Sequence, residues 1–286
     1  MKKSLKLLAM AIALIVVLGG IVSPVSAKHL KNGEIVTYDV DAGGFNLKMD
    51  ISNMKAKYTV VFEHGLGADR TWWDAIQPEI AKYANTVSYD RAGAGESEVS
   101  PSPRSFSTMC EELHTALKNA KVKGPYIFVG HSWGGAMSRI YATKYPKEVK
   151  GIVFVDSSHE DMYSMMISAE GPEFVDEINS EVVGLENNTL QNLYDCFQEL
   201  RDSRKLDSIR NTPIKVLAGN KQVSEKYDLG WLELQKDIAS LSDDSIYTEV
   251  DGSHFIPEEQ PQAVIDAVLE TLQRVKKKNN DKPCKP

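Results

Sequence analysis

The strongest constraint on the fold is a regular alternation of short apolar runs with segments of helical spacing. The runs cover residues 58–63, 85–89, 126–129, 151–155, 214–218 and 246–250. Short continuous apolar runs are typical of strands that are buried on both faces of a parallel sheet. Between them, apolar side chains recur every three or four residues over 72–83, 106–120 and 264–272. The alternation predicts an α/β fold with a doubly wound, mostly parallel sheet.

An antiparallel hairpin is predicted ahead of this pattern. Residues 35–40 and 45–51 alternate apolar and polar side chains around the turn at residues 41–44. Two alternating runs joined by a Gly-rich turn are typical of a hairpin. With its two strands, the predicted sheet has eight strands.

A long insertion interrupts the alternation after the run that ends at Val155. Residues 157–212 are far more than one crossover connection needs. Their apolar residues follow a loosely helical spacing, so we predict a helical cap over the strand ends. Met162, Met165 and Met166 would line a pliable, apolar substrate-binding pocket beneath it. Ordinary packing between cap and core is the alternative for each methionine.

The N-terminus has the layout of a secretory signal peptide. Lysines at positions 2, 3 and 6 precede an apolar run over residues 7–22, and Ala27 follows shortly after. The run is shorter than the ~20 residues of a membrane-spanning helix. We therefore expect cleavage after Ala27 and a secreted protein, with membrane contact only through the signal segment. An uncleaved N-terminal anchor is the alternative.

The predicted organisation is one α/β domain with a single insertion. Its parts are a signal peptide (1–27), a core (28–156 and 213–278), a helical cap (157–212) and a basic, flexible tail (279–286).

Composition narrows the possible partners and cofactors. The formal net charge of −7 gives no electrostatic reason to expect binding of nucleic acid. The three cysteines, Cys110, Cys196 and Cys284, are too few and too scattered for a disulfide framework or a metal site. We expect free thiols or at most one bridge, no metal and no cofactor.

The pattern G-x-S-x-G occurs at residues 130–134, with Ser132 at its centre. The pattern alone is weak evidence, but its context is specific. It follows the apolar run that ends at Val129 and opens a helix over about residues 135–144. A sharp turn between strand and helix exposes the serine hydroxyl, and the flanking glycines leave room for the backbone. Ser132 is therefore predicted to be a nucleophile.

A second loop is predicted to complete an oxyanion hole. Residues 64–67, His-Gly-Leu-Gly, directly follow the apolar run that ends at Glu63. The backbone N–H groups of Leu66 and Trp133 would bind the negative charge of a tetrahedral intermediate. His64, in the same loop, is predicted to contact the substrate. A plain Gly-rich turn is the alternative interpretation.

A serine nucleophile needs a base, and the chain has six histidines. His254 stands alone in a loop directly after the last predicted strand, which makes it the first choice. His159, at the entrance of the cap, is the second choice. The others lie near the mature N-terminus, in the oxyanion loop, inside a helix or beside the nucleophile: His29, His64, His114 and His131.

The base in turn needs a carboxylate that fixes its tautomer. Asp156 ends the run over residues 151–155, and a strand end holds a side chain in a defined place. Glu225 and Asp228, in the predicted loop after residues 214–218, are the alternatives. An Asp156 that merely caps the first cap helix is also possible.

These residues resemble the α/β-hydrolase family, from about Tyr58 to the last helix. The motifs that carry the resemblance, in order, are residues 64–65, 90–97, 130–135 and 252–255. The resemblance implies that Ser132 is the nucleophile, that His254 is the base and that residues 90–97 form a turn that shapes the pocket. The chain departs from the family at residues 219–222, Gly-Asn-Lys-Gln, where members often carry G-x-x-D. Some members take the acid from the place of Asp156 instead.

Three functions follow for testing. The first is a secreted serine hydrolase, a carboxylesterase, which cleaves a small-molecule ester or related acyl compound through an acyl-enzyme. The second is an aminopeptidase, because residues 130–135 are similar to the elbow of proline iminopeptidases. Glu170, Glu173, Asp176 and Glu177 would then hold the substrate amine, or form a solvated helix face. The third is a non-catalytic binding protein on a hydrolase scaffold.

Overall fold

The computed structural model describes residues 32–280 of the chain. The predicted signal peptide, residues 1–27, lies outside the described residues, as do residues 281–286 of the predicted tail. Within the described part, no helix combines the length and the apolar character needed to cross a membrane.

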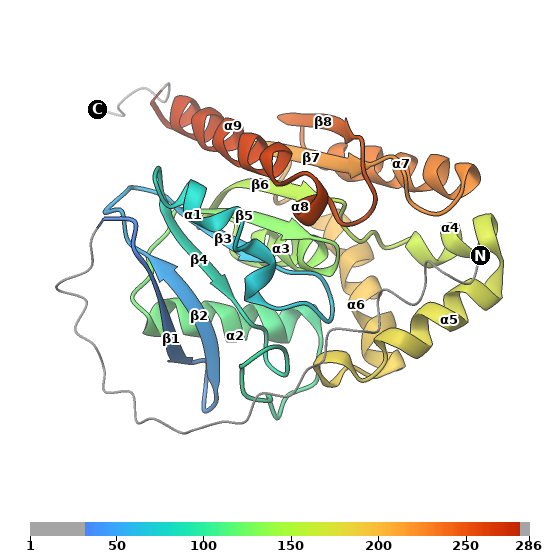
Figure 1. Ribbon diagram of the computed structural model, residues 1–286, viewed down its shortest axis with the longest axis horizontal. Helices are drawn as coiled ribbons and strands as arrows, with labels where there is room; N and C mark the ends of the chain where they lie inside the picture. Colours follow the sequence, from blue (N-terminus) through green and yellow to red (C-terminus); the bar gives the residue numbers. More distant parts are fainter. Residues whose placement is uncertain (1–31, 281–286) are drawn as a thin grey trace. The chain divides into compact units, whose positions relative to one another are not determined.

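An eight-stranded sheet forms the centre of the described chain (Figure 1). Its strands lie in the order β1-β2-β4-β3-β5-β6-β7-β8. β2 pairs antiparallel with β1 and β4, and all other neighbouring strands are parallel. The strands are β1 (Ile35–Asp41), β2 (Asn46–Ser52), β3 (Thr59–Glu63), β4 (Asn85–Tyr89), β5 (Tyr126–His131), β6 (Val149–Val155), β7 (Ile214–Gly219) and β8 (Ser245–Val250). The predicted fold class is confirmed.

Helices cover both faces of the sheet, because alternate strand residues point to opposite sides. On β5, Phe128 packs in one hydrophobic cluster, while Ile127 and Val129 pack in the other. One face is covered by α2 (Phe106–Asn119) and α3 (Trp133–Lys144), and the other by α1 (Gln77–Ile80), α8 (Ile256–Glu259) and α9 (Pro261–Asn280). Burial on both faces explains why these strands read as continuous apolar runs.

The segment between β6 and β7 contains three α-helices and two short 3-10 turns. They are α4 (Met162–Glu170), α5 (Pro172–Val182), η3 (Leu185–Asn187), α6 (Leu190–Ser203) and η4 (Arg204–Leu206). Thr189 and Asn192 form a reciprocal capping box that starts α6. The buried face of α6, with Leu193 and Leu200, joins the core cluster that includes α3. This contact anchors the cap segment to the sheet domain.

The loops after β3, β5 and β6 meet at one edge of the sheet. β3 and β5 are parallel neighbours, with Glu63 opposite Gly130. β5 and β6 are also parallel neighbours, with His131 opposite Val155. The carboxyl ends of parallel neighbours lie side by side. The loop residues brought together in this way are 64–67, 132–134 and 156–158.

The prediction that Glu225 and Asp228 lie in a loop was wrong, because both residues lie in the first turn of helix α7 (Glu225–Ala239). The hydroxyl of Ser224 caps the start of this helix. The apolar periodicity is incomplete because Gln235 is fully buried in a position where an apolar residue would be expected. Its side chain hydrogen-bonds the backbone that follows β6 instead.

Two other boundaries differ from the sequence analysis. The helix predicted over residues 72–83 is divided into the 3-10 turn η2 (Arg70–Trp73) and the short helix α1. Pro78 stands in the first turn of α1, where proline favours a new helix start. α9 runs to Asn280, so residues 279–280 are helical rather than part of the tail.

A substitution at Gly134, at the start of α3, would test how closely α3 packs against the end of β3. A Cβ there would lie 2.3 Å from the carbonyl oxygen of Glu63, a backbone atom that cannot rotate away. We expect Gly134→Ala to lower the free energy of unfolding by about 1–3 kcal/mol in urea titrations.

Gly230→Ala is the matched control, because a Cβ at Gly230 meets only the flexible side chain of Met165. This helical site should keep its stability or gain up to about 1 kcal/mol. Equal losses in both variants would contradict the packing argument.

Candidate active site

Ser132 lies at the sharp turn between β5 and α3. Its backbone has φ 54° and ψ −122°, a region that residues other than glycine rarely occupy. The turn can close because a Cβ at Gly130 is absent; it would lie 2.4 Å from the carbonyl oxygen of Gly134. The side chain is partly exposed at the strand end. A hydroxyl in this place can meet a substrate.

The imidazole of His254 lies next to this hydroxyl. Ser132 Oγ donates to His254 Nε2 over 2.9 Å. The loop that follows β8 carries His254, and its backbone carbonyl accepts a hydrogen bond from His131 Nε2 at 2.8 Å. The side chain of His254 is 30% exposed, so water and substrate can reach it.

Asp156 is a fully buried carboxylate that receives four hydrogen bonds. Oδ2 accepts from His254 Nδ1 at 2.6 Å and from Gln222 Nε2 at 3.0 Å. Oδ1 accepts from the backbone N–H of Gly219 at 2.7 Å and from Trp231 Nε1 at 2.9 Å. The carboxylate fixes the His254 tautomer with its proton on Nδ1, which leaves Nε2 free to accept the serine proton.

The alternative acids do not reach His254. Asp228 Oδ1 accepts from the backbone N–H groups of Gln222 and Val223. Glu225 is exposed at the start of α7. Among the predicted acids, only Asp156 is hydrogen-bonded to the imidazole.

Gln222 is a site residue that the sequence analysis missed. It occupies the position after β7 where a carboxylate was sought, and its amide donates to Asp156 instead. The signal in the sequence was the missing carboxylate at that position. A carboxylate after β6 and an amide after β7 together stand in for the single carboxylate that was sought after β7.

The amides of Leu66 and Trp133 flank the serine. A Cβ at Gly65 would lie only 3.5 Å from Ser132 Cβ, so the loop after β3 runs close beside the turn. Within residues 32–280, neither the Leu66 N–H nor the Trp133 N–H has a hydrogen-bond partner. α3 begins at Trp133, and the positive end of its dipole adds to the potential there. Two free donors beside a hydroxyl can bind an oxyanion.

His64, which was predicted to contact the substrate, lies in the interior instead. Its Nδ1 donates to the carbonyl of Gly65 at 2.8 Å, and its Nε2 accepts from the backbone N–H of Arg91 at 3.3 Å. Burial, assisted by the charge of Arg91, lowers the pKa of His64 to about 3. Both ring nitrogens of this neutral side chain are used inside the protein. The structure therefore indicates that His64 links the backbone of residue 65 to that of residue 91 and does not contact the substrate.

The three methionines of the predicted pocket lie on α4, which packs on α7. Met166 is 4% exposed and packs in a cluster with Trp231. Met162 and Met165 are partly exposed at the edge of the same cluster. The ring centroids of Trp231 and His254 are 5.8 Å apart. The methionines thus pack around Trp231, and ordinary packing describes Met166 best.

His159, the second candidate for the base, belongs to a separate ionic cluster. Its Nε2 bonds Asp237 Oδ2 at 2.7 Å, and its Nδ1 accepts from the backbone N–H of Asp161 at 2.9 Å. Arg204 also bonds Asp237. Both ring nitrogens are occupied, and neither bonds Ser132.

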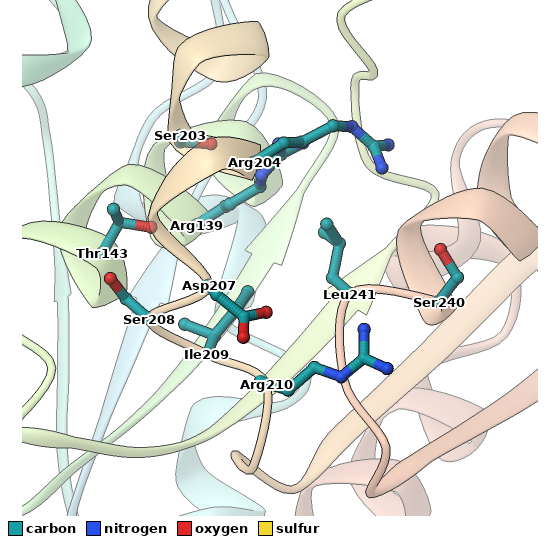
Figure 2. A pocket seen from close by; sticks show the side chains of 10 residues that line it. All are labelled: Arg139, Thr143, Ser203, Arg204, Asp207, Ser208, Ile209, Arg210, Ser240 and Leu241. Carbon is teal, nitrogen blue, oxygen red and sulfur yellow. The ribbon is translucent and has the colours of Figure 1, made fainter.

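A cavity of about 180 Å³ lies beside this ionic cluster, and Figure 2 shows the side chains that line it. Arg139 and Arg204 in its wall pair with Glu160, and Arg210 pairs with Asp243. Its lining contains no residue of the Ser132 site. The cavity is therefore separate from the candidate active site.

Metal-ligating residues are not clustered in the described part of the chain, where no group of three or more His, Cys, Asp or Glu side chains could hold an ion. Cys110 and Cys196 are buried free thiols. Cys284 lies outside the described residues.

Comparisons with known proteins agree with this architecture. The family model for the alpha/beta hydrolase fold matches residues 58–189. An esterase from Thermogutta terrifontis superposes with a TM-score of 0.64 and 21% identity, over 85% of this chain and 99% of that one. The chain has the α/β-hydrolase fold. This fold supports hydrolase activity.

The α/β-hydrolase fold does not by itself decide the reaction. A bromoperoxidase from Bacillus anthracis matches with a TM-score of 0.62 and 16% identity, over 83% of this chain and 100% of that one. The uncharacterized protein YqjL of Bacillus subtilis is 29% identical over 237 residues, which are 82% of this chain and 90% of YqjL. The chain spans only 18–42% of the next curated relatives that it matches. The reaction is set by the residues of the site rather than by the fold.

One further titratable group of this α/β-hydrolase lies directly under the oxyanion loop. Glu63 ends β3 and is fully buried. Its Oε1 accepts from the hydroxyl of Tyr89 at 2.7 Å, and its Oε2 lies 3.6 Å from Arg91 Nη1 with no hydrogen bond among the described residues. Burial raises the pKa of Glu63 from 4.5 to about 7, although the charge of Arg91 opposes this shift. The folded state therefore favours the protonated carboxyl.

This raised pKa predicts a pH-dependent stability. The folded protein binds the Glu63 proton more tightly than the unfolded chain, so the resulting stability is full below pH 4.5 and is lost as the pH rises to about 7. The loss is on the order of 3 kcal/mol at about 1.4 kcal/mol per pKa unit. Glu63→Gln, which mimics the neutral form, should gain stability relative to the parent over this range in urea titrations between pH 5 and pH 8.

Glu258→Gln, on an exposed residue of α8, controls for the loss of a surface carboxylate. Parallel stability profiles for the parent and Glu63→Gln would contradict the role of the buried carboxyl.

Proposed function

We propose that the chain is a serine hydrolase that cleaves a carboxylic ester through an acyl-enzyme. The observation that carries this proposal is the unbroken line of hydrogen bonds from Asp156 through His254 to Ser132. Two free backbone amides lie beside this line, where negative charge would develop. Nucleophile, base, acid and oxyanion donors are the complete set that acyl transfer needs.

The geometry supports the following acylation step. Ser132 Oγ attacks the ester carbonyl carbon while His254 Nε2 takes the hydroxyl proton. The carbonyl oxygen becomes an oxyanion, and the N–H groups of Leu66 and Trp133 donate to it. When the intermediate collapses, the C–O bond to the leaving alkoxide breaks and His254 returns its proton to that oxygen. Asp156 stabilises the imidazolium that exists between the two proton transfers.

Deacylation repeats the sequence with water. His254 Nε2 takes a proton from a water molecule as its oxygen attacks the acyl carbon, and the same amides bind the second oxyanion. Collapse breaks the bond to Ser132 Oγ, which recovers its proton from His254. The carboxylic acid leaves and the free serine is restored.

The surroundings favour a small or medium acyl substrate with apolar character. A Cβ at Gly67 would lie 2.8 Å from Leu185 Cδ1, so this exposed leucine of the cap lies against the oxyanion loop. Trp231 packs beside His254, with the two ring centroids 5.8 Å apart. Apolar walls around a few fixed donors are typical of sites for small molecules.

The two other functions have less support. The acidic cap residues that would bind a substrate amine are all exposed: Glu170, Glu173, Asp176 and Glu177. No buried, unpaired acid of the cap is available among the described residues for a proline aminopeptidase. A non-catalytic scaffold would have no need for a buried carboxylate that orients a histidine toward a serine.

We also propose that the mature protein acts outside the cytoplasm. The support is the basic and apolar N-terminal sequence that ends at Ala27. N-terminal sequencing of protein recovered from an expressing host should begin at Lys28, and recovery of the uncleaved chain in the membrane fraction would indicate an anchor instead.

The catalytic assignment predicts graded losses of turnover. Ser132→Ala should remove hydrolysis of p-nitrophenyl acetate and butyrate, as well as labelling by a fluorophosphonate probe. Asp156→Asn should lower kcat by roughly 10³–10⁴, because the tautomer of His254 is no longer fixed. His159→Gln serves as the control outside the site and should retain the kcat of the parent. Probe labelling that persists in Ser132→Ala would sink the proposal.

Substrate class can be tested with matched leaving groups. We expect turnover of short p-nitrophenyl esters and no release of proline from Pro-naphthylamide at equal enzyme concentration. The reverse preference would assign the aminopeptidase function to the same triad.

A further inference from the structure

The cap sends one acidic side chain into the interior. Glu186 in η3 is 4% exposed, whereas its neighbours Leu185 and Asn187 are exposed. Glu186 has φ 52° and Asn187 has φ 59°, which is the left-handed conformation that favours glycine. Residues other than glycine keep such a conformation only where the surroundings hold it. The turn is therefore shaped around the inward carboxylate.

The partner of Glu186 is the guanidinium of Arg91, in the turn after β4. Arg91 Nε donates to Oε2 at 2.8 Å, and Arg91 Nη2 donates to Oε1 at 2.7 Å. Arg91 is 1% exposed. This bidentate pair joins the cap to the core with water excluded from both partners.

The same two side chains also hold the oxyanion loop. Arg91 Nη1 donates to the carbonyl of His64 at 2.7 Å, and Arg91 Nη2 donates to that of Gly65 at 2.9 Å. The backbone N–H of Gly67 donates to Glu186 Oε1 at 3.2 Å. The backbone groups on both sides of Leu66 are thus fixed, which sets the direction of the free Leu66 N–H.

Close packing supports the same link. A Cβ at Gly67 would lie 2.8 Å from Leu185 Cδ1, and one at Gly93 would lie 2.5 Å from Asn187 Nδ2. The cap turn, which is η3 (Leu185–Asn187), therefore contacts both the oxyanion loop and the turn that carries Arg91. A larger residue at Gly67 or Gly93 would therefore displace the side chain of Leu185 or Asn187.

We propose that Arg91 and Glu186 are positioning residues that align the Leu66 oxyanion donor only while the cap turn is docked. This inference rests on the proposed function, because it gives the Leu66 N–H a role in acyl transfer. If the turn lifts away, Arg91 loses its counter-charge and Gly67 loses its acceptor, and the loop is free to turn the donor away from Ser132. Cap docking and oxyanion binding are then one event.

The first test is Glu186→Gln, compared with Glu181→Gln on the exposed face of α5. Active sites are counted by fluorophosphonate titration, so that kcat refers to folded enzyme. We expect Glu186→Gln to lower kcat about 10- to 100-fold, in the range of a misplaced oxyanion donor, with KM changed less than about 3-fold. Glu181→Gln should match the parent. A parental kcat in Glu186→Gln would overturn the proposal.

A second variant separates positioning from stability. Arg91→Met combined with Glu186→Leu replaces the buried pair by apolar side chains of similar size, an exchange that often preserves stability. We expect a folded protein whose kcat stays low, whereas a merely structural pair would give parental kcat in this variant. Arg91→Lys keeps the charge but cannot reach two carbonyls and a carboxylate together. It should also show a low kcat.

Hydrogen exchange provides a readout that needs no catalysis. Amides of residues 64–68 and 184–188 should exchange faster in Glu186→Gln than in the parent, while those of α9 stay unchanged. Unchanged exchange in both segments would overturn the link. If the parent shows no Ser132-dependent turnover, the proposed function fails, and the exchange of these segments alone decides whether Glu186 holds the loop.

Discussion

The site depends on how closely three backbone segments pack at the carboxyl ends of β3, β5 and β6. A Cβ at Gly130, Gly134 or Gly135 would meet its neighbour at 2.3–2.4 Å, in each case across a different pair of segments or within the turn. This packing holds Ser132 in a conformation that a serine rarely adopts and brings the amide of Leu66 beside it. A looser junction would leave the hydroxyl and the free amides of Leu66 and Trp133 in separate places.

Two buried carboxyls near this junction have opposite surroundings. Asp156 receives four hydrogen bonds, one of which comes from the His254 imidazole that it orients. Among residues 32–280, Glu63 receives one hydrogen bond, from Tyr89, and has one oxygen without a donor. Donors offset the cost of burying a carboxylate, and their absence favours the neutral acid. The first carboxyl can thus stabilise an imidazolium, while the second is raised in pKa by its burial.

Local patterns in the sequence predicted the fold and singled out Ser132 and His254, which are hydrogen-bonded to each other. Each parallel strand was located from a short run rich in apolar residues, and Ser132 and His254 each lie in a turn or loop that follows such a run. Asp156 was chosen by the same reasoning, but the amide of Gln222 that supports it was not foreseen, because the two residues are 66 apart in the chain. Helix α7 was missed because buried polar Gln235 interrupts its apolar face. His64 was predicted to contact the substrate because no local pattern indicated that the backbone N–H of Arg91 would hydrogen-bond its ring.

The pair formed by Arg91 and Glu186 has a geometric rather than an energetic rationale. Removing both charges from water costs about as much as their attraction returns, so an apolar pair would stabilise the cap equally well. Only a guanidinium presents a planar set of donors that reaches one carboxylate and two carbonyls together. Glu63 adds a second carboxyl beside this cation, 3.6 Å from it. The group formed by Arg91, Glu186 and Glu63 has no net charge when one of its two acids is protonated. Burial can therefore raise the pKa of Glu63 while Arg91 and Glu186 stay paired.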